Sequence, residues 1–184
     1  ILYVIHHIIV KANLFLLAGV INRAGGSFEL KEVGGLYKTL PWLGVLFLVP
    51  ALSLAGLPPL SGFWSKFVVV KASLDAGHAL LAATALAVGV LTLYSMLKIW
   101  NEAFWKAAPA ASTTATERWL ADTGTRRVML TPIVILAAIT LTIGVMAEPF
   151  IAFSLRAGEQ LLDKHAYVEA VLGPGPQRSA EWQP

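Results

Sequence analysis

Long apolar blocks separated by short polar stretches dominate the chain. A membrane-crossing helix needs about 20 consecutive, mostly apolar residues, and four segments fit that length and pattern. They cover residues 1–21, 41–75, 78–105 and 128–154. The pattern predicts an all-α integral membrane fold, with a transmembrane bundle over residues 1–155 and an extramembrane tail over 156–184.

The second segment carries its own interruption, in the stretch SLAGLPPLSGFWSK. Pro58, Pro59 and Gly62 predict a broken helix, because proline lacks a backbone donor and glycine weakens a helix interior. Residues 41–75, about 35 in all, are too many for one straight crossing and too few for two crossings with a normal turn. The segment is therefore either one broken crossing or two short ones.

The basic residues favour a single broken crossing. In that arrangement the loops 22–40 and 106–127 share one side of the membrane. These loops hold most of the basic residues, namely Arg23, Lys31, Lys38, Lys106, Arg118, Arg126 and Arg127. Two crossings would instead divide the basic residues almost evenly. By the positive-inside rule, we expect both loops to be cytoplasmic and the C-terminus to lie outside.

Composition supports the membrane assignment and excludes several classes of function. The 184 residues are 57% hydrophobic and only 14% charged, whereas soluble domains carry about 25% charged residues. The net charge of +3 is small, so we expect a lipid bilayer and no nucleic acid as the partner surface. The chain has no cysteine, which excludes disulfides and thiolate ligands.

No phosphate-binding, dinucleotide-binding or metal-ligand motif is present, so we expect neither a cofactor nor a bound metal. The chain begins at Ile1 within an apolar run, without an initiator methionine or a charged leader. We therefore expect the sequence to be the C-terminal part of a longer protein.

Lys66 is the strongest candidate for a functional side chain. A charged group at membrane depth costs roughly 2.5–3.5 kcal/mol on insertion scales, and such groups usually face a bundle interior or water. Lys66 directly follows the predicted break, and transporters use broken helices to build ion sites near the membrane centre. A lysine held there could gain and lose a proton during turnover. The alternative is that its ammonium group reaches the interface.

His7 and Lys11 form a second candidate pair. They lie one helical turn apart in HHIIVKANLFLL, so their side chains share a helix face. Histidine titrates near neutrality, and together the two residues could relay protons. His6 points about 100° away from His7, so only one of the two histidines is expected to face Lys11. An interfacial position for the histidines remains the open alternative.

Acidic residues are absent from the mid-membrane parts of these segments. A sodium site normally uses oxygen ligands, often carboxylates. The sequence therefore indicates proton-handling groups without an evident sodium site. Any carboxylate partner of Lys66 or Lys11 is expected from elsewhere in the protein or from another subunit.

The residues described above also carry a resemblance. In order and spacing, HHIIVKANLFLLAGVI, GGLYKTLP and SLAGLPPLSGFWSK resemble the C-terminal half of the antiporter-like membrane subunits. These subunits are shared by Mrp-type multisubunit sodium/proton antiporters and proton-pumping NADH:quinone oxidoreductases. Together with AYVEAVLG at residues 166–173, the proline-containing block SLAGLPPLSGFWSK is most similar to the D subunits of the Mrp type.

The resemblance implies roles for particular residues. Lys66 matches the family's lysine after the broken helix, which belongs to a central axis of proton-transfer groups. Lys11 and His7 match the lysine of the preceding helix and the histidine one turn before it. Some relatives have a further histidine where this chain has Tyr3, and no relay role is implied there.

Three functions remain in competition at this point. The first is a proton-translocating subunit of a hetero-oligomeric antiporter in the bacterial cell membrane, exchanging H⁺ for a monovalent cation, Na⁺ being favoured. This is a secondary transporter and not an enzyme. The second is the corresponding subunit of a redox-driven NADH:quinone oxidoreductase. The third is a packing subunit in which Lys11 and Lys66 only fix the helix register.

Overall fold

The computed structural model describes residues 1–163 and 171, with the side chain of Ala111 excepted. Over these residues the predicted all-α fold is confirmed, and no strand occurs. The described elements are α1 (Leu2–Gly25), α2 (Leu36–Thr39), α3 (Pro41–Ala55), α4 (Ser61–Asp75), α5 (Ala79–Trp100), a π-helix (Asn101–Trp105), α6 (Ala110–Ala121), α7 (Thr123–Val145) and α8 (Ala147–Leu162).

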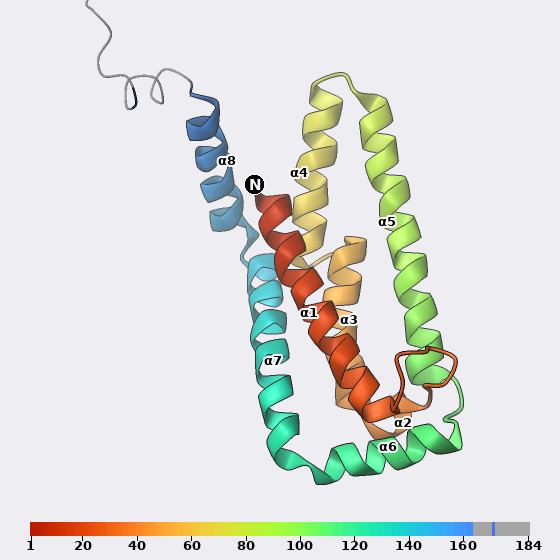
Figure 1. The fold of residues 1–184 in the computed structure, drawn as a ribbon. Coiled ribbons are helices and arrows are strands. Elements are labelled where there is room, and N and C mark those ends of the chain that lie inside the picture. Colours follow the sequence, from red (N-terminus) through yellow and green to blue (C-terminus); the bar gives the residue numbers. More distant parts are fainter. Residues whose placement is uncertain (164–170, 172–184) are drawn as a thin grey trace, which may run out of the picture.

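Three helical stretches are long and apolar enough to cross a membrane on their own: Leu2–Gly25, Ala79–Trp105 and Thr123–Val145. A further crossing, the second in chain order, is divided between α3 and α4. Figure 1 shows α3 rising from the lower end of the bundle, α4 continuing to the upper end, and α5 returning downward. The break near Pro58–Gly62 therefore interrupts one crossing, as the distribution of basic residues favoured.

Helix boundaries differ from the sequence expectation most clearly in the C-terminal half of the chain. The segment expected as one helix over 128–154 contains α7 and α8, which meet at Met146. The ring of Pro149 accounts for this, because in a continuous helix it would collide with the carbonyl four residues earlier. The helix α8 then extends into the expected tail 156–184. The loop expected over 106–127 contains α6, which lies across the lower end of the bundle (Figure 1).

The C-terminal part of the chain lies partly outside the described residues. This applies to residues 164–170 and 172–184, and hence to nearly all of the AYVEAVLG block.

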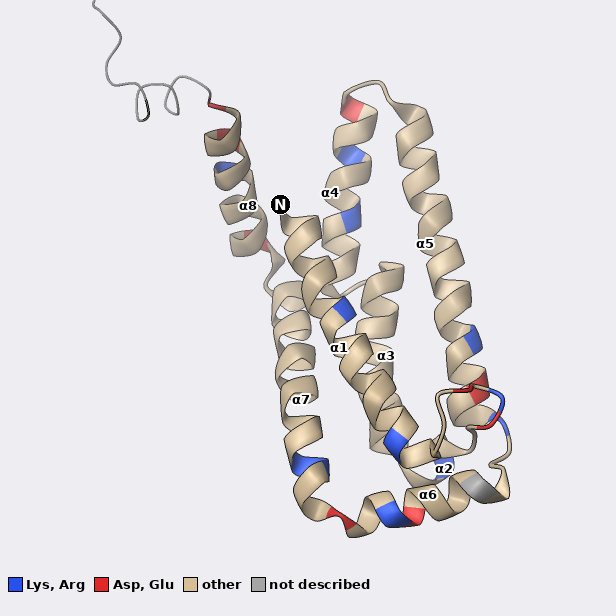
Figure 2. Cartoon of the chain, in the orientation of Figure 1, with Lys and Arg blue, Asp and Glu red and all other residues tan. Residues whose placement is uncertain are grey.

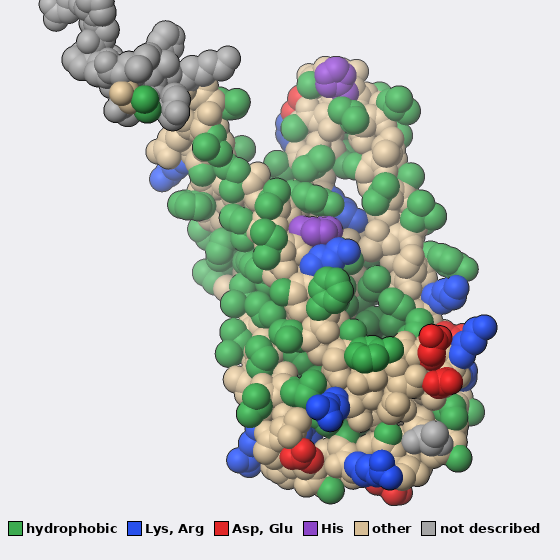
Figure 3. Space-filling view, in the orientation of Figure 1, with side chains coloured by type: hydrophobic (Ala, Val, Ile, Leu, Met, Phe, Trp, Pro, Cys, Tyr) green, Lys and Arg blue, Asp and Glu red, His purple; other side chains and the backbone are tan. Residues whose placement is uncertain are grey.

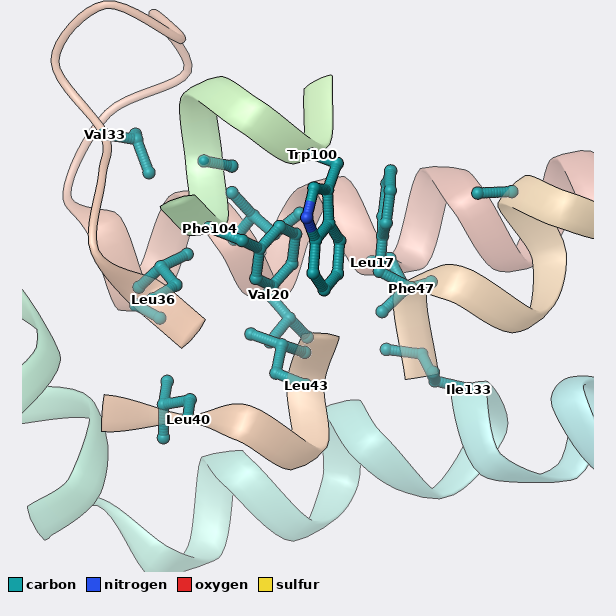
Figure 4. Close-up of a cluster of buried hydrophobic side chains, with 14 of the residues drawn as sticks. Leu17, Val20, Val33, Leu36, Leu40, Leu43, Phe47, Trp100, Phe104 and Ile133 are labelled. Atoms are coloured by element: carbon teal, nitrogen blue, oxygen red, sulfur yellow. The ribbon is translucent and has the colours of Figure 1, made fainter. Parts of the chain in front are cut away.

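An aromatic cluster lies in the hydrophobic core shared by α1, α3 and the end of α5 (Figure 4). The rings of Trp100 and Phe104 stack with centroids 4.8 Å apart, and Phe47 of α3 lies 5.3 Å from Phe104. Gly44 allows this approach, because an added Cβ would lie 3.0 Å from the Trp100 ring. The cluster joins α3 to the end of α5, and Leu17 and Val20 of α1 complete it.

Hydrophobic side chains are spread over the face seen in Figure 3, whereas charged residues gather mainly toward the lower end (Figures 2 and 3). That end holds both segments 22–40 and 106–127, which the sequence placed on a common side. The arrangement suits a membrane protein, because apolar spans between polar ends match the layers of a bilayer.

Candidate functional site

The candidate site is built on the interruption between α3 and α4, which lies midway along the bundle (Figure 1). The helix α3 ends at Ala55, and Gly56 follows with a φ of 95°. This left-handed conformation favours glycine. The backbone N–H of Gly56 reaches back to the carbonyls of Leu52 and Ser53, both at 3.0 Å. The break thus leaves some terminal backbone groups to be satisfied by side chains.

Two serines flank the break and meet each other inside the protein. Ser53 and Ser61 are fully buried, and their Oγ atoms are hydrogen-bonded at 3.0 Å. The Ser53 hydroxyl also accepts a hydrogen bond from the Gly62 backbone N–H at 3.2 Å. One side chain of α3 therefore satisfies a free amide in the first turn of α4, which is the function of a helix cap.

His6 of α1 extends this serine pair into a chain of three polar side chains. Its Nδ1 is hydrogen-bonded to Ser61 Oγ at 2.9 Å, and the side chain is only 2% exposed. Hydroxyl and imidazole groups can each donate and accept, depending on tautomer. The His6–Ser61–Ser53 chain therefore joins α1, α4 and α3 at one point.

Gly62 makes this close approach possible. A Cβ at this position would collide with the carbonyl of Ser53 and would lie 3.0 Å from His6 Cε1. The break residues thus have distinct tasks. Gly62 allows close packing, whereas Pro58 and Pro59 lie exposed in the connection between the two helices.

Lys66 lies one turn further along α4 and reaches back to the end of α3. Its Nζ donates a hydrogen bond to the Ala55 carbonyl at 2.8 Å. The C-terminal end of a helix carries partial negative charge, so it stabilises a cation. The side chain passes two glycines: added Cβ atoms would lie 2.7 Å from Lys66 Cδ at Gly56 and 3.1 Å from Nζ at Gly89.

His7 and Lys11 lie on another face of α1 from His6. Lys11 is exposed. The half-buried ring of His7 stacks on Tyr3, with centroids 5.6 Å apart and an interplanar angle of 25°. Among the described residues, no hydrogen bond or ion pair joins Lys66 to either of them. The hydrogen bonds at the break therefore involve His6 and Lys66 and do not include His7 or Lys11.

In the described part of the chain, Lys66, Lys11, His6 and His7 make no ion pair with an acidic residue. Ion pairs of the described residues include Lys71–Asp75 and Lys106–Glu102, both away from the break. Over the same residues, no group of three or more His, Asp and Glu side chains could hold a metal ion.

His6, Ser53 and Ser61 are the candidate residues that sequence reasoning missed. A signal was available for His6, because His6, Asn13 and Leu17 share one helical face with Val10. All four of these side chains are buried. The two serines carried no comparable signal, because buried serines in membrane helices commonly bond only to their own backbone.

Comparisons with known proteins agree on a single family. Residues 1–92 match the family described as "NADH:quinone oxidoreductase/Mrp antiporter, TM". The chain is 47% identical to the D subunit of a Na⁺/H⁺ antiporter of Alkalihalophilus pseudofirmus, over 92% of this chain and 33% of the relative. It is 35% identical to the D subunit of a Na⁺/H⁺ antiporter of Bacillus subtilis, again over 92% of this chain and 33% of the relative.

A third relative is an N subunit of the NADH-quinone oxidoreductase of Koribacter versatilis, 34% identical over 70% of this chain and 26% of the relative. Among solved structures, the Mrp complex from Dietzia sp. DQ12-45-1b contains a chain with a TM-score of 0.79 and 34% identity. The match covers 94% of this chain and 39% of that one. The chain thus spans about a third of the length of the two antiporter relatives.

The close packing at Gly62 generates a stability prediction. Gly62→Ala is expected to destabilise the protein by about 1–3 kcal/mol, because overpacking forces the α3–α4 junction apart. Gly19→Ala is the matched control, since its added Cβ would make an ordinary 3.7 Å contact with Met129. Alanine there should be neutral or stabilising by up to about 1 kcal/mol. Thermal unfolding of the full-length protein in detergent measures both, and equal stability of the two variants would contradict the packing described.

Proposed function

Because the chain belongs to the family of membrane subunits shared by NADH:quinone oxidoreductases and Mrp antiporters, we propose that it is part of a proton-translocating subunit of a multisubunit Na⁺/H⁺ antiporter. The two relatives named as D subunits of Na⁺/H⁺ antiporters support the antiporter assignment. The likeness to a chain of an Mrp complex supports hetero-oligomeric assembly. The protein is then a secondary transporter rather than an enzyme.

The observation that carries the proposal is the hydrogen bond from Lys66 to the Ala55 carbonyl across the broken helix. The ammonium group is held by a helix end and has no carboxylate partner among the described residues. A strong permanent ion pair would hold the lysine in its charged form. A carbonyl holds it less strongly, so the group can release a proton and take one up again.

Protonation at Lys66 is coupled to the geometry of the break in this proposal. The charged form is attracted to the negative end of α3, and the neutral amine loses that attraction. Gly56 and Gly89 line the path of the side chain and present no side chain that obstructs it. A change in charge at Lys66 therefore alters how firmly α4 is attached to α3.

The proton path includes Lys11 and His7 as well as Lys66. Support for these two comes from their positions in the family pattern and from their shared face on α1, where Tyr3 stacks on the His7 ring. The His6–Ser61–Ser53 chain is a further part of the path, because its hydrogen bonds connect α1 to the break. Proton transfer along such a chain needs only donors and acceptors in contact.

We also propose which cation is exchanged and how the chain is oriented in the membrane. The names of the two antiporter relatives support Na⁺ as the exchanged cation. The protein is placed in the bacterial cell membrane, with residues 22–40 and 106–127 on the cytoplasmic side and the C-terminus outside. The clustering of basic residues at the lower end of the bundle supports this orientation (Figure 2).

A second candidate function is the corresponding proton-pumping subunit of a NADH:quinone oxidoreductase. The similarity to the Koribacter versatilis protein supports it, at a lower identity and over less of the chain than the Alkalihalophilus pseudofirmus relative. The purified native complex separates the two. An antiporter is expected to contain only membrane subunits, whereas flavin and iron–sulfur absorbance in the complex would establish the oxidoreductase.

Replacement of Lys66 tests the proton-transfer role. Lys66→Ala in the complete complex, reconstituted into proteoliposomes, is expected to slow Na⁺/H⁺ exchange about a hundredfold, the size of effect that one proton-transfer group supplies. Lys71→Ala is the matched control, since Lys71 lies on the same helix, is exposed and pairs with Asp75 at 2.6 Å. Exchange at the wild-type rate by an assembled Lys66→Ala complex would refute the role.

The serine chain generates a separate prediction. Ser61→Ala removes the group that links His6 to Ser53 and is expected to slow exchange about tenfold, the effect of one lost hydrogen bond. Ser73→Ala on the same helix is the control, because its hydroxyl is exposed and bonds only to the Val69 carbonyl at 2.8 Å. The same proteoliposome assay applies, and an unchanged rate for Ser61→Ala would remove the chain from the path.

A further inference from the structure

A cleft of about 470 Å³ opens at the lower end of the bundle, away from the broken helix. It lies where the end of α1, the helix α6 and the start of α7 meet (Figure 1). Its walls are formed by Asn22, Arg23, Gly26, Ala115, Arg118, Trp119, Asp122 and Thr125. The volume falls within the range of small-molecule sites, about 300–1,000 Å³.

The cleft is held open by defined contacts. Thr116 of α6 donates a hydrogen bond to the carbonyl of Ala24 at 2.8 Å, which fixes α6 against the end of α1. The Trp119 side chain is buried to all but 4% and packs into the protein core. Gly26 ends α1 with a φ of 84°, a left-handed turn that suits glycine.

The charges of the cleft favour an anion. Arg23 and Arg118 are exposed, and among the described residues neither side chain makes a hydrogen bond or an ion pair. The indole Nε1–H of Trp119 also has no acceptor there. Arg23 and Arg118 therefore supply free donors to the cleft, and both are permanently charged.

Asp122 is the one acidic residue of the cleft, and it is already engaged. Its carboxylate accepts a hydrogen bond from the Thr125 backbone N–H at 3.0 Å, which caps α7. Hydrogen bonding by Thr125, with a smaller contribution from the charge of Arg23, lowers the pKa of Asp122 below its ordinary value. The carboxylate therefore stays ionised, and the cleft keeps one excess positive charge.

The position of the cleft indicates the source of the anion. It lies at the polar end of two apolar spans, α1 and α7, while α6 runs across that end (Figure 1). Such a level corresponds to the headgroups of a bilayer, where tryptophan and arginine are common. Basic pockets between membrane helices at this level are suited to phospholipid headgroups.

From these observations we infer that the cleft binds the phosphate of an anionic phospholipid headgroup. The guanidinium groups of Arg23 and Arg118 bind the phosphate oxygens, for which their forked geometry is suited. The Asp122 carboxylate accepts a hydrogen bond from a headgroup hydroxyl, such as those of phosphatidylglycerol. A choline headgroup has no such donor, so the cleft discriminates against it.

Lipid titration of the complete complex tests this inference. The complex is stripped of lipid in detergent, and its melting temperature is followed during addition of phosphatidylglycerol or of phosphatidylcholine with the same acyl chains. Phosphatidylglycerol is expected to raise the melting temperature saturably. The double variant Arg23→Gln, Arg118→Gln should need about tenfold more of it, since each basic residue contributes to headgroup binding.

Arg127→Gln is the matched control, a basic residue at the same end that does not line the cleft. An equal loss in Arg127→Gln would reduce the effect to general surface charge and overturn the inference. Equal shifts from the two lipids would also overturn it. The same saturable shift from inorganic phosphate alone would assign the cleft to a free anion and overturn the lipid assignment.

A second measurement does not depend on any variant. Photoactivatable phosphatidylglycerol, added to the wild-type complex, is expected to label residues 22–26 or 115–125 of this chain. Labelling of this chain only at other positions would overturn the inference even if the melting temperature responds to lipid.

Discussion

The central constraint on this structure is that backbone polar groups at membrane depth need partners within the protein. The helix interruption after Ala55 frees carbonyls from α3 and amides from α4 midway along an apolar bundle. Side chains meet this need: the Ser53 hydroxyl accepts from the Gly62 amide, and Lys66 donates to the Ala55 carbonyl. These hydrogen bonds stabilise the break, because they replace the backbone partners that the interrupted helix lacks.

The same constraint explains the packing around the break. Polar groups can satisfy one another only at hydrogen-bonding distance, so the backbones must approach closely. Gly62 removes the side chain that would block Ser53, and Gly144 of α7 does the same opposite Pro59 and Ser61. Trp64 then ties α4 to the end of α7 by donating to the Gly144 carbonyl at 2.8 Å. Glycine positions thus decide which helices can meet at the junction.

Sequence reasoning was effective where a single local rule decides the outcome. Apolar block length predicted the spans, the Pro-Pro-Gly pattern predicted the break between α3 and α4, and the distribution of basic residues favoured one crossing over two. Sequence reasoning failed where the structure depends on contacts between segments that are distant in the chain. The end of α7 at Val145 has a local signal in Pro149, but α6 has a polar composition typical of a loop. Its helix is supported by contacts such as Thr116 with Ala24, which are far apart in the chain.

The candidate site shows the same division between local and long-range information. Lys66 was recognisable because a cation beside a helix break is unusual in any membrane segment. Its partner is a backbone carbonyl, which has no side-chain signature, and the serine chain needs His6 and Ser61 to meet across 55 residues. The relay role of Lys11 and His7 stays a prediction.

The contacts at Lys66 also change how the packing hypothesis relates to the transport hypothesis. A lysine that bonds to the end of α3 has a structural task whether or not it carries protons. The two roles do not exclude each other, because a proton can shift a conformation only if it interacts differently with the two states. The helix end provides that difference, since it attracts the charged form of Lys66 and not the neutral one. If Lys66 only fixed the helix register, a change in its protonation state would have no role in transport. On the proposed function, the structural contact is what makes the charge state of Lys66 consequential for the arrangement of α3 and α4.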